Sequence, residues 1–329
     1  MKKAFKFIFG TLALLLIMLV AVFWTPDTDR DEMIAKYGGP SSSFIKDKNG
    51  LNIHVRDQGK RDGAPLILIH GGNSSLHVWE KMVTVLGDEF RLISLDLPGH
   101  GLTGANTAED YTTLAMTEAI EDVMDALSIE KAVWVGNSFG GRVAWHGTLL
   151  RPDRVSGLIL IDASGSVTGD PIKLYLAARI ARSPAGGWLV PNFTPKSIVK
   201  ASLKQVYAND ENVTDEIVNR HWELARFPGN RDAVLAMTKL SIERYHWDNI
   251  GNIAVPTLIL WGEQDETIPL PFAKAFESHI KGSMLITYPN AAHVPMEEIP
   301  EDLTRDIKSW YTSNFQLNSR TALATKPIE

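Results

Sequence analysis

A short glycine-rich segment of the sequence contains the residue types of a nucleophilic centre. Ser138 lies in the middle of GNSFG at 136–140, which follows the apolar run Ala132–Gly136 and precedes a stretch of helical pattern. This is the G-x-S-x-G pattern of a nucleophile elbow, a strained strand-to-helix turn that exposes the serine hydroxyl. Small flanking residues are needed there because the backbone turns sharply and neighbouring segments approach closely. The pattern predicts Ser138 as a nucleophile.

A serine hydroxyl needs a general base to accept its proton. Of the nine histidines, His293 has the most suitable position, directly after the apolar run Met284–Tyr288. A loop in that position reaches the carboxyl ends of parallel strands, where open α/β sheets bind ligands. His100 lies in a Gly/Pro turn, and His70 ends a strand where we expect it to bond backbone. We therefore predict His293 as the base. Structural or surface roles are expected for the rest, which are His54, His70, His77, His100, His146, His221, His246 and His279.

The base in turn needs a carboxylate that holds its tautomer and stabilises the imidazolium. Asp265 follows the strand before the histidine strand, and Asp162 ends the strand after the nucleophile. Both keep the chain order serine, acid, histidine that is typical of such triads. We favour Asp265 because its loop neighbours the loop of His293. Asp162 and Glu263 remain alternatives.

The negative oxygen that forms during acyl transfer needs backbone N–H donors. HGGN at 70–73 follows another predicted strand, and its glycines allow the backbone to approach a substrate. We predict the N–H groups of Gly72 and Phe139 as the oxyanion donors. Asn73 is the alternative to Gly72 and is also expected to contact the substrate.

The pattern of apolar residues predicts the strands and helices that would position these residues. Continuous apolar runs are typical of strands that are buried on both faces of a parallel sheet. They alternate with helical stretches such as Asp110–Leu127, which predicts an α/β fold. The clear strands are Pro65–His70, Phe90–Asp96, Ala132–Gly136, Gly157–Asp162, Pro256–Trp261 and Met284–Tyr288, with Leu51–Arg56 as a weaker candidate near an edge.

The segment from Asp162 to about Trp247 lacks convincing strand patterns. It is rich in helix formers and aromatic residues. We expect a helical cap over one end of the sheet at 163–247. The hydrolytic core then comprises 44–162 and 248–315, and a polar, flexible tail covers 316–329. Aromatic side chains of the cap are expected as pocket walls, namely Trp188, Trp222, Phe227 and Trp247.

The N-terminus has a different composition. Three lysines, at positions 2, 3 and 6, precede an uncharged run from Phe7 to Trp24. That length approaches the roughly 20 residues that span a bilayer as a helix. No small-x-small cleavage site follows, so we expect an uncleaved signal anchor at 1–26 rather than a signal peptide. A polar connector at 27–43 would follow. The lysines would stay cytoplasmic and the catalytic domain would lie across the membrane, in the periplasm of a bacterium.

The composition excludes several other classes of function. A net charge of −6 over 329 residues disfavours a nucleic-acid surface, which needs a basic patch. The absence of cysteine excludes disulfides, thiolate nucleophiles and cysteine-based zinc sites. No HExxH spacing is present, so we expect neither a metal nor a cofactor. The oligomeric state is not determined by the sequence.

Taken together, the motifs resemble those of the α/β-hydrolase family from about Phe44 to Trp310. The similar segments are HGG at 70–72, DLPGHG at 96–101, GNSFGG at 136–141, WGEQDETIP at 261–269 and AHVPMEEIP at 292–300. The resemblance implies an eight-stranded, mostly parallel sheet flanked by helices, a helical cap, and a triad of Ser138, Asp265 and His293. Ala292 departs from the family pattern, which usually has glycine there.

The resemblance also bears on the reaction. Family members with an aspartate nucleophile act as dehalogenases or epoxide hydrolases, and Ser138 argues against both. GNSFGG is also similar to the carbon–carbon bond hydrolases that act on vinylogous diketones. Those enzymes usually carry G-x-G-P-G in the oxyanion segment, whereas this chain has GGNSS at 71–75. We therefore expect a carboxylesterase or lipase-like enzyme that uses an acyl-enzyme and a small-molecule ester. The carbon–carbon hydrolase and a non-catalytic ligand-binding member of the fold are the alternatives.

Overall fold

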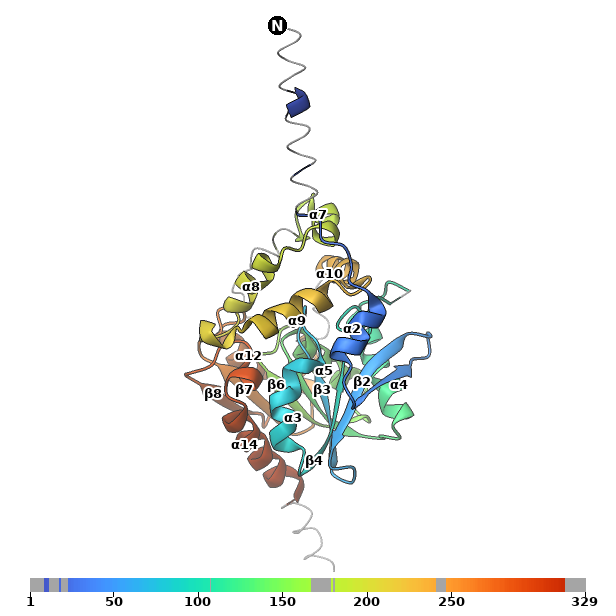
Figure 1. The fold of residues 1–329 in the computed structure, drawn as a ribbon. Coiled ribbons are helices and arrows are strands. Elements are labelled where there is room, and N and C mark those ends of the chain that lie inside the picture. The colour runs from blue at the N-terminus through green and yellow to red at the C-terminus, as the bar shows by residue number, and fades with distance from the viewer. Residues whose placement is uncertain are drawn as a thin grey trace, which may run out of the picture.

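A single mixed sheet forms the centre of the computed structural model, which describes residues 9–11, 18, 23–106, 108–166, 179, 181–240 and 247–316 (Figure 1). The strand order is β1-β2-β4-β3-β5-β6-β7-β8. The first two strands pair antiparallel, β2 also pairs antiparallel with β4, and all remaining neighbours are parallel. The strands are β1 (Ser42–Lys46), β2 (Asn52–Gly59), β3 (Ala64–Ile69), β4 (Phe90–Leu95), β5 (Ala132–Asn137), β6 (Val155–Ile161), β7 (Thr257–Gly262) and β8 (Met284–Tyr288). The expected eight-stranded, mostly parallel sheet is confirmed.

Helices cover both faces of this sheet, which explains why the central strands are apolar throughout. One apolar cluster joins the sheet to α4 (Thr113–Ala126), α5 (Phe139–Leu150) and α12 (Pro271–His279). A second cluster joins the other face to α3 (Glu80–Leu86) and α14 (Pro300–Tyr311). Short helical turns complete the core at η1 (Leu76–Trp79), η3 (Ile250–Asn252), α13 (Pro295–Glu298) and η4 (Thr312–Gln316).

The predicted cap is helical where the structure describes it. Its elements are α7 (Gly186–Asn192), α8 (Lys196–Lys204), η2 (Asp210–Asn212), α9 (Asp215–Ala225) and α10 (Asn230–Lys239). Figure 1 shows them gathered at one end of the sheet. Local sequence defines where they start: the Thr214 side chain accepts the N–H of Ile217 and so caps the first turn of α9. Residues 167–178, 180 and 241–246 of the predicted cap lie outside the described residues, as do 317–329 of the predicted tail.

The segment expected to be a polar connector, 27–43, contains regular structure. Helix α2 (Arg30–Tyr37) begins after Asp29, whose side chain accepts the N–H of Glu32. Met33 on this helix is buried against Leu102, Leu224 and Phe227. Ile34 and Tyr37 pack against the same cluster, so α2 has a short apolar face among its charged residues. The start of β1 at Ser42 also lies within the segment.

The predicted membrane placement is contradicted. No helix among the described residues is both long and apolar enough to cross a bilayer. Most of the run from Phe7 to Trp24, on which the prediction depended, lies outside the described residues. The expected anchor rested on the hydropathy of that run and the lack of a cleavage site after it, and the expected location across a membrane rested on the three lysines before it.

Candidate active site

Ser138 occupies the strained turn that its motif predicts. It connects β5 to α5 with φ 53° and ψ −116°, a conformation that non-glycine residues rarely adopt. Its own N–H donates to the carbonyl of Ile161 at 3.1 Å, and its carbonyl accepts the N–H of Arg142 at 3.1 Å. The turn is therefore held from both sides, by a neighbouring strand and by the following helix.

The glycines around Ser138 permit this close packing. A Cβ atom on Gly140 would collide with the carbonyl oxygens of Ile69 and His70 in the adjoining strand and loop. A Cβ atom on Gly141 would lie only 2.5 Å from the Cβ of Ala163. Any larger residue would push α5 away from the sheet and displace the serine.

His293 and Asp265 form a buried hydrogen-bonded pair. Nδ1 of His293 lies 2.7 Å from Oδ2 of Asp265, and both residues are buried. The other carboxylate oxygen of Asp265 accepts the N–H groups of Thr267 at 2.7 Å and Ile268 at 3.0 Å. These bonds orient the carboxylate toward the imidazole, and a ring nitrogen that faces a carboxylate carries the proton. Nε2 is then left as the basic nitrogen.

The backbone of His293 is held at both ends. Its N–H donates to the carbonyl of Val206 in the cap at 3.1 Å. Its carbonyl accepts Nδ2 of Asn137, the residue before the nucleophile, at 3.0 Å. The histidine loop is thereby tied to the nucleophile turn and to the cap together.

Neither alternative acid contacts the imidazole in the same way. Glu263 is exposed, and its Oε1 accepts the hydroxyl of Thr287 at 2.6 Å. Asp162 is buried, and its Oδ1 accepts the N–H of Gly262 at 3.0 Å. The ligand atoms of Asp162, Asp265 and His293 lie within 4.8 Å of one another, which is a spacing that could hold a metal ion. The direct bond between His293 and Asp265 already uses two of those atoms, so the arrangement fits a hydrogen-bonded pair.

The predicted oxyanion loop lies against the nucleophile turn. A Cβ atom on Gly71 would be 3.2 Å from the Cβ of Ser138, and one on Gly72 would be 3.7 Å from the Cβ of Phe139. Phe139 is the first residue of α5, and N–H groups in the first turn of a helix have no partner within the helix. The positive end of the helix dipole adds to the attraction for a developing oxyanion.

The buried His70 supports this loop, in agreement with the expectation that it bonds backbone. Nδ1 of His70 donates to the carbonyl of Gly71 at 2.7 Å, because its Nε2 accepts the N–H of Leu97 at 3.0 Å. Burial lowers the pKa of His70, which favours this neutral form. His70 therefore connects the predicted oxyanion loop to the chain after β4.

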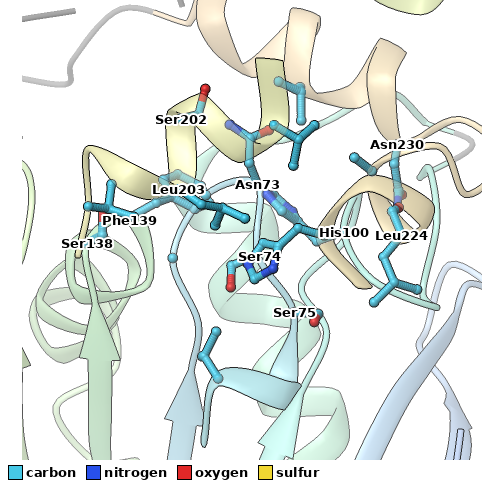
Figure 2. A pocket seen from close by; sticks show the side chains of 18 of the residues that line it. Asn73, Ser74, Ser75, His100, Ser138, Phe139, Ser202, Leu203, Leu224 and Asn230 are labelled. Atoms are coloured by element: carbon cyan, nitrogen blue, oxygen red, sulfur yellow. The ribbon is translucent and has the colours of Figure 1, made fainter. Parts of the chain in front are cut away.

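Ser138 and His293 line one pocket, with a cavity volume of about 380 Å³, between the sheet and the cap (Figure 2). Gly72, Asn73 and Phe139 line it too. Figure 2 shows Ser138, Phe139 and Leu203 on one side of it and Leu224 and Asn230 on the other. Much of the wall that the cap contributes is aliphatic or aromatic: Val190, Phe193, Ile198, Val199, Leu203, Val206, Leu224 and Val234.

Polar groups at the pocket are mostly occupied by protein partners. Arg231 donates to the carbonyl of Thr25 and to Asp27, at 2.6 Å in each case. Glu297 accepts the hydroxyl of Tyr207, and Arg220 lies 3.4 Å from its other oxygen. Burial raises the pKa of Glu297 despite these two partners. Burial, with the nearby Arg220 guanidinium, lowers the pKa of His221 to about 4.

None of the aromatic residues predicted as pocket walls is among the described lining residues. Trp188 is 56% exposed, and the indole N–H of Trp222 donates to the carbonyl of Thr194. Phe227 is buried with Met33 beneath α2, while Trp247 packs against Trp145 and Phe276 in the core. Size and aromaticity alone do not indicate which face of a cap helix a side chain occupies.

Sequence reasoning missed the aliphatic wall. Ile198, Val199 and Leu203 all belong to α8 and recur at helical spacing. This apolar stripe was the available signal, because a short amphipathic helix in a cap must direct its apolar face inward.

Comparisons with known proteins agree with this architecture. The family model described as the alpha/beta hydrolase fold matches residues 64–183. The chain is 29% identical, over 77% of its length and 94% of the relative's, to a pimeloyl-[acyl-carrier protein] methyl ester esterase of Edwardsiella ictaluri. It is 26% identical, over 77% of its length and 90% of the relative's, to a 2-hydroxy-6-oxononadienedioate/2-hydroxy-6-oxononatrienedioate hydrolase of Comamonas testosteroni.

A solved structure is similar throughout the same region. The meta-cleavage product hydrolase from Pseudomonas fluorescens superimposes with a TM-score of 0.71 at 25% identity. The match covers 82% of this chain and 97% of that one. These relatives thus include a methyl ester esterase and a meta-cleavage product hydrolase.

Proposed function

Because the chain belongs to the α/β-hydrolase fold family, we propose that it is a serine hydrolase that cleaves carboxylic esters. The observation that carries this proposal is the shared pocket of Ser138 and His293, with Asp265 bonded to the imidazole at 2.7 Å. A nucleophile, its base and the carboxylate that orients the base are the parts that acyl transfer through serine requires.

The reaction proceeds in two halves. Ser138 attacks the ester carbonyl while Nε2 of His293 accepts its proton, and the N–H groups of Gly72 and Phe139 stabilise the oxyanion. His293 then protonates the leaving alcohol, which leaves an acyl group on Ser138. Water, deprotonated by the same imidazole, releases the acid and restores the serine.

The pocket wall supports an uncharged aliphatic acyl or alcohol group. Its side chains from α7 to α10 are largely aliphatic, and removal of apolar surface from water stabilises a bound chain by roughly 25 cal/mol per Å². The similarity to a methyl ester esterase is consistent with this substrate class.

Carbon–carbon bond hydrolysis is the second candidate, because relatives carry such names. The substrate named for the Comamonas relative is a dicarboxylate, which a cationic side chain would recognise. Within the described lining, Arg231 is the one lysine or arginine, and Asp27 already pairs with it. This favours the ester over the charged diketone.

Substitution of the nucleophile tests the reaction class. We expect S138A to lower the hydrolysis of short p-nitrophenyl esters by at least about 10³-fold, since the acyl-enzyme can no longer form. Ser156 lies near the amino-terminal end of β6, whereas the site lies at the carboxyl ends of the strands. S156A therefore makes the same chemical change away from the site and serves as the control. Labelling by a fluorophosphonate probe should occur in wild type and S156A and be absent in S138A. Undiminished activity in S138A would contradict the proposal, and failure of wild type to label would support a non-catalytic binding role.

A substrate comparison separates the two hydrolytic candidates. Wild-type enzyme is assayed with p-nitrophenyl esters of increasing acyl length and with a vinylogous diketone that carries carboxylates. We expect kcat/KM for the preferred ester to exceed that for the diketone. A diketone turned over far faster than every ester would favour carbon–carbon hydrolysis instead.

A further inference from the structure

Asp162 is a buried carboxyl group that the proposed reaction does not use. It follows the last residue of β6, and its relative exposure is 0%. Its φ of 44° lies in the left-handed region, which is unfavourable for a residue with a Cβ atom. A charged or polar side chain at such a position needs compensating contacts.

The contacts of Asp162 lead to the loop of Asp265. Oδ1 of Asp162 accepts the N–H of Gly262 at 3.0 Å, and the carbonyl of Gly262 accepts the N–H of Asp265 at 3.2 Å. Gly262 is the last residue of β7. Asp162 therefore holds the point from which the Asp265 loop leaves the sheet.

A count of hydrogen bonds indicates which of the two carboxyl groups carries a proton. Asp265 accepts from Thr267, Ile268 and His293, as an ionised carboxylate does. Asp162 accepts from Gly262 alone, and its buried Oδ2 accepts no hydrogen bond from a described residue. An oxygen atom of each carboxyl lies within 4.8 Å of the other. Two buried carboxylates that close repel strongly, so one of them is neutral.

We propose that Asp162 is a positioning residue, protonated at Oδ2, that holds Gly262 through Oδ1 and presents its O–H to the Asp265 carboxylate. This inference rests on the proposed function, because it assigns Asp265 as the acid that orients His293.

The surroundings of Asp162 favour its neutral form. Burial, followed by the nearby Asp265 carboxylate, raises its pKa well above the ordinary value, and Glu298 acts in the same direction. The N–H of Gly262 is the main opposing influence. The titratable groups that face Asp162 are thus Asp265, His293 and Glu298.

A neutral Asp162 has a consequence for the base. A second anion beside His293 would stabilise the imidazolium, so that less of the base would be free to accept a proton. With a proton on Asp162, Asp265 is held in place while the two carboxyl groups together carry only one negative charge.

The pH profile of D162N tests the protonation state. An amide has the shape of a carboxylic acid, can accept from Gly262 and donate toward Asp265, and carries no charge. We expect the acidic limb of the kcat/KM profile to keep its midpoint within about 0.3 pH units, because the net charge beside His293 does not change. A fall of that midpoint by about one unit or more would mean that wild-type Asp162 is ionised and would overturn the proposal.

A larger truncation tests the positioning role. D162A cannot hold Gly262, so we expect kcat to fall at least about tenfold with little change in KM, since misplacement of a catalytic group slows the chemical step. D162N should restore most of this loss. Equal kcat in D162A and D162N would overturn the role.

Infrared spectroscopy keeps the proposal testable where D162A does not fold. Wild type near neutral pH should show the C=O stretching band of a buried protonated carboxyl, and D162N should lack it. Absence of the band in wild type would contradict the proposal. The activity of S138A separates the two ways in which the proposal can fail. If the serine mechanism is wrong, S138A retains activity; if only the Asp162 proposal is wrong, S138A is still inactive.

Discussion

At the scale of single residues, the proposed nucleophile Ser138 lies in a strained backbone conformation. A non-glycine residue in a sparsely populated conformation costs of order 1–3 kcal/mol and persists only where its surroundings hold it. Here the surroundings are the Ile161 carbonyl, the Arg142 N–H and the N–H of Ser164, which donates to the Ser138 carbonyl at 3.0 Å. This turn leaves Ser138 among the residues that line the pocket.

This strain leads to a prediction about stability. We expect S138G to have a larger free energy of unfolding than S138A, by about 1 kcal/mol, because glycine adopts a positive φ without a steric cost. Both variants should be inactive toward esters. Urea unfolding at constant pH measures the difference. If S138G is the less stable of the two, the turn is not strained in solution.

At the scale of elements, the site exists because loops after β3, β5, β7 and β8 all leave the sheet at its carboxyl edge. Parallel pairing of these strands brings the oxyanion loop, Ser138, Asp265 and His293 to one end. The cap then covers that end, and the bond from His293 to the Val206 carbonyl joins the two parts.

The segment before α2 is bound to the outer side of the cap. Thr25 exchanges hydrogen bonds with Asn192 and Thr194, and Thr28 donates to the carbonyl of Arg226. Arg231 of α10 bonds both Thr25 and Asp27 while it also lines the pocket. The position of the pocket wall therefore depends on chain that precedes the hydrolase core.

Substitution of Arg231 tests this connection. We expect R231A to lower the melting temperature and to raise KM for esters several-fold, because the cap loses its bonds to Thr25 and the guanidinium leaves a gap in the wall. D27N keeps the Thr25 bonds and removes a half-exposed ion pair, which is worth about 1 kcal/mol or less. Its effects should be smaller. Unchanged KM and melting temperature in R231A would show that the segment does not position the cap.

At the scale of the whole molecule, histidines with a lowered pKa contribute to the way stability depends on pH. Burial lowers the pKa of His77 and of His221 to about 4 and that of His100 to about 3. Unfolding returns each ring to an ordinary pKa near 6.5. Between about pH 6.5 and 4, these three histidines therefore bind more protons in the unfolded chain than in the native protein, and the proton on native Asp162 offsets one of them.

The sign of the effect follows from this difference in bound protons. The free energy of unfolding should fall as the pH drops from about 6.5 toward 4, by up to about 1.4 kcal/mol per pH unit for each such histidine. Urea unfolding at a series of pH values measures the slope, and H221Q should reduce it. A free energy of unfolding that stays constant between pH 7 and 5 would contradict the burial of neutral histidines.

The local patterns of the chain were sufficient to predict a large part of this protein. Continuous apolar runs predicted the parallel strands, and GNSFG after such a run predicted the turn at Ser138, because both depend on residues that are adjacent in sequence. The order of strands placed His293 and Asp265 in neighbouring loops. Their roles in catalysis stay predictions until the variants are measured.

Other features depended on contacts between distant segments, which no local pattern encodes. The predicted aromatic walls Trp188, Trp222, Phe227 and Trp247 lie elsewhere because the face that a cap helix turns inward depends on its packing partners. The charge state of Asp162 depends on a carboxyl group 103 positions away, at Asp265. Burial and proximity of this kind arise only when the chain is folded, so the tertiary structure alone decided which side chains form the pocket and which acid faces His293.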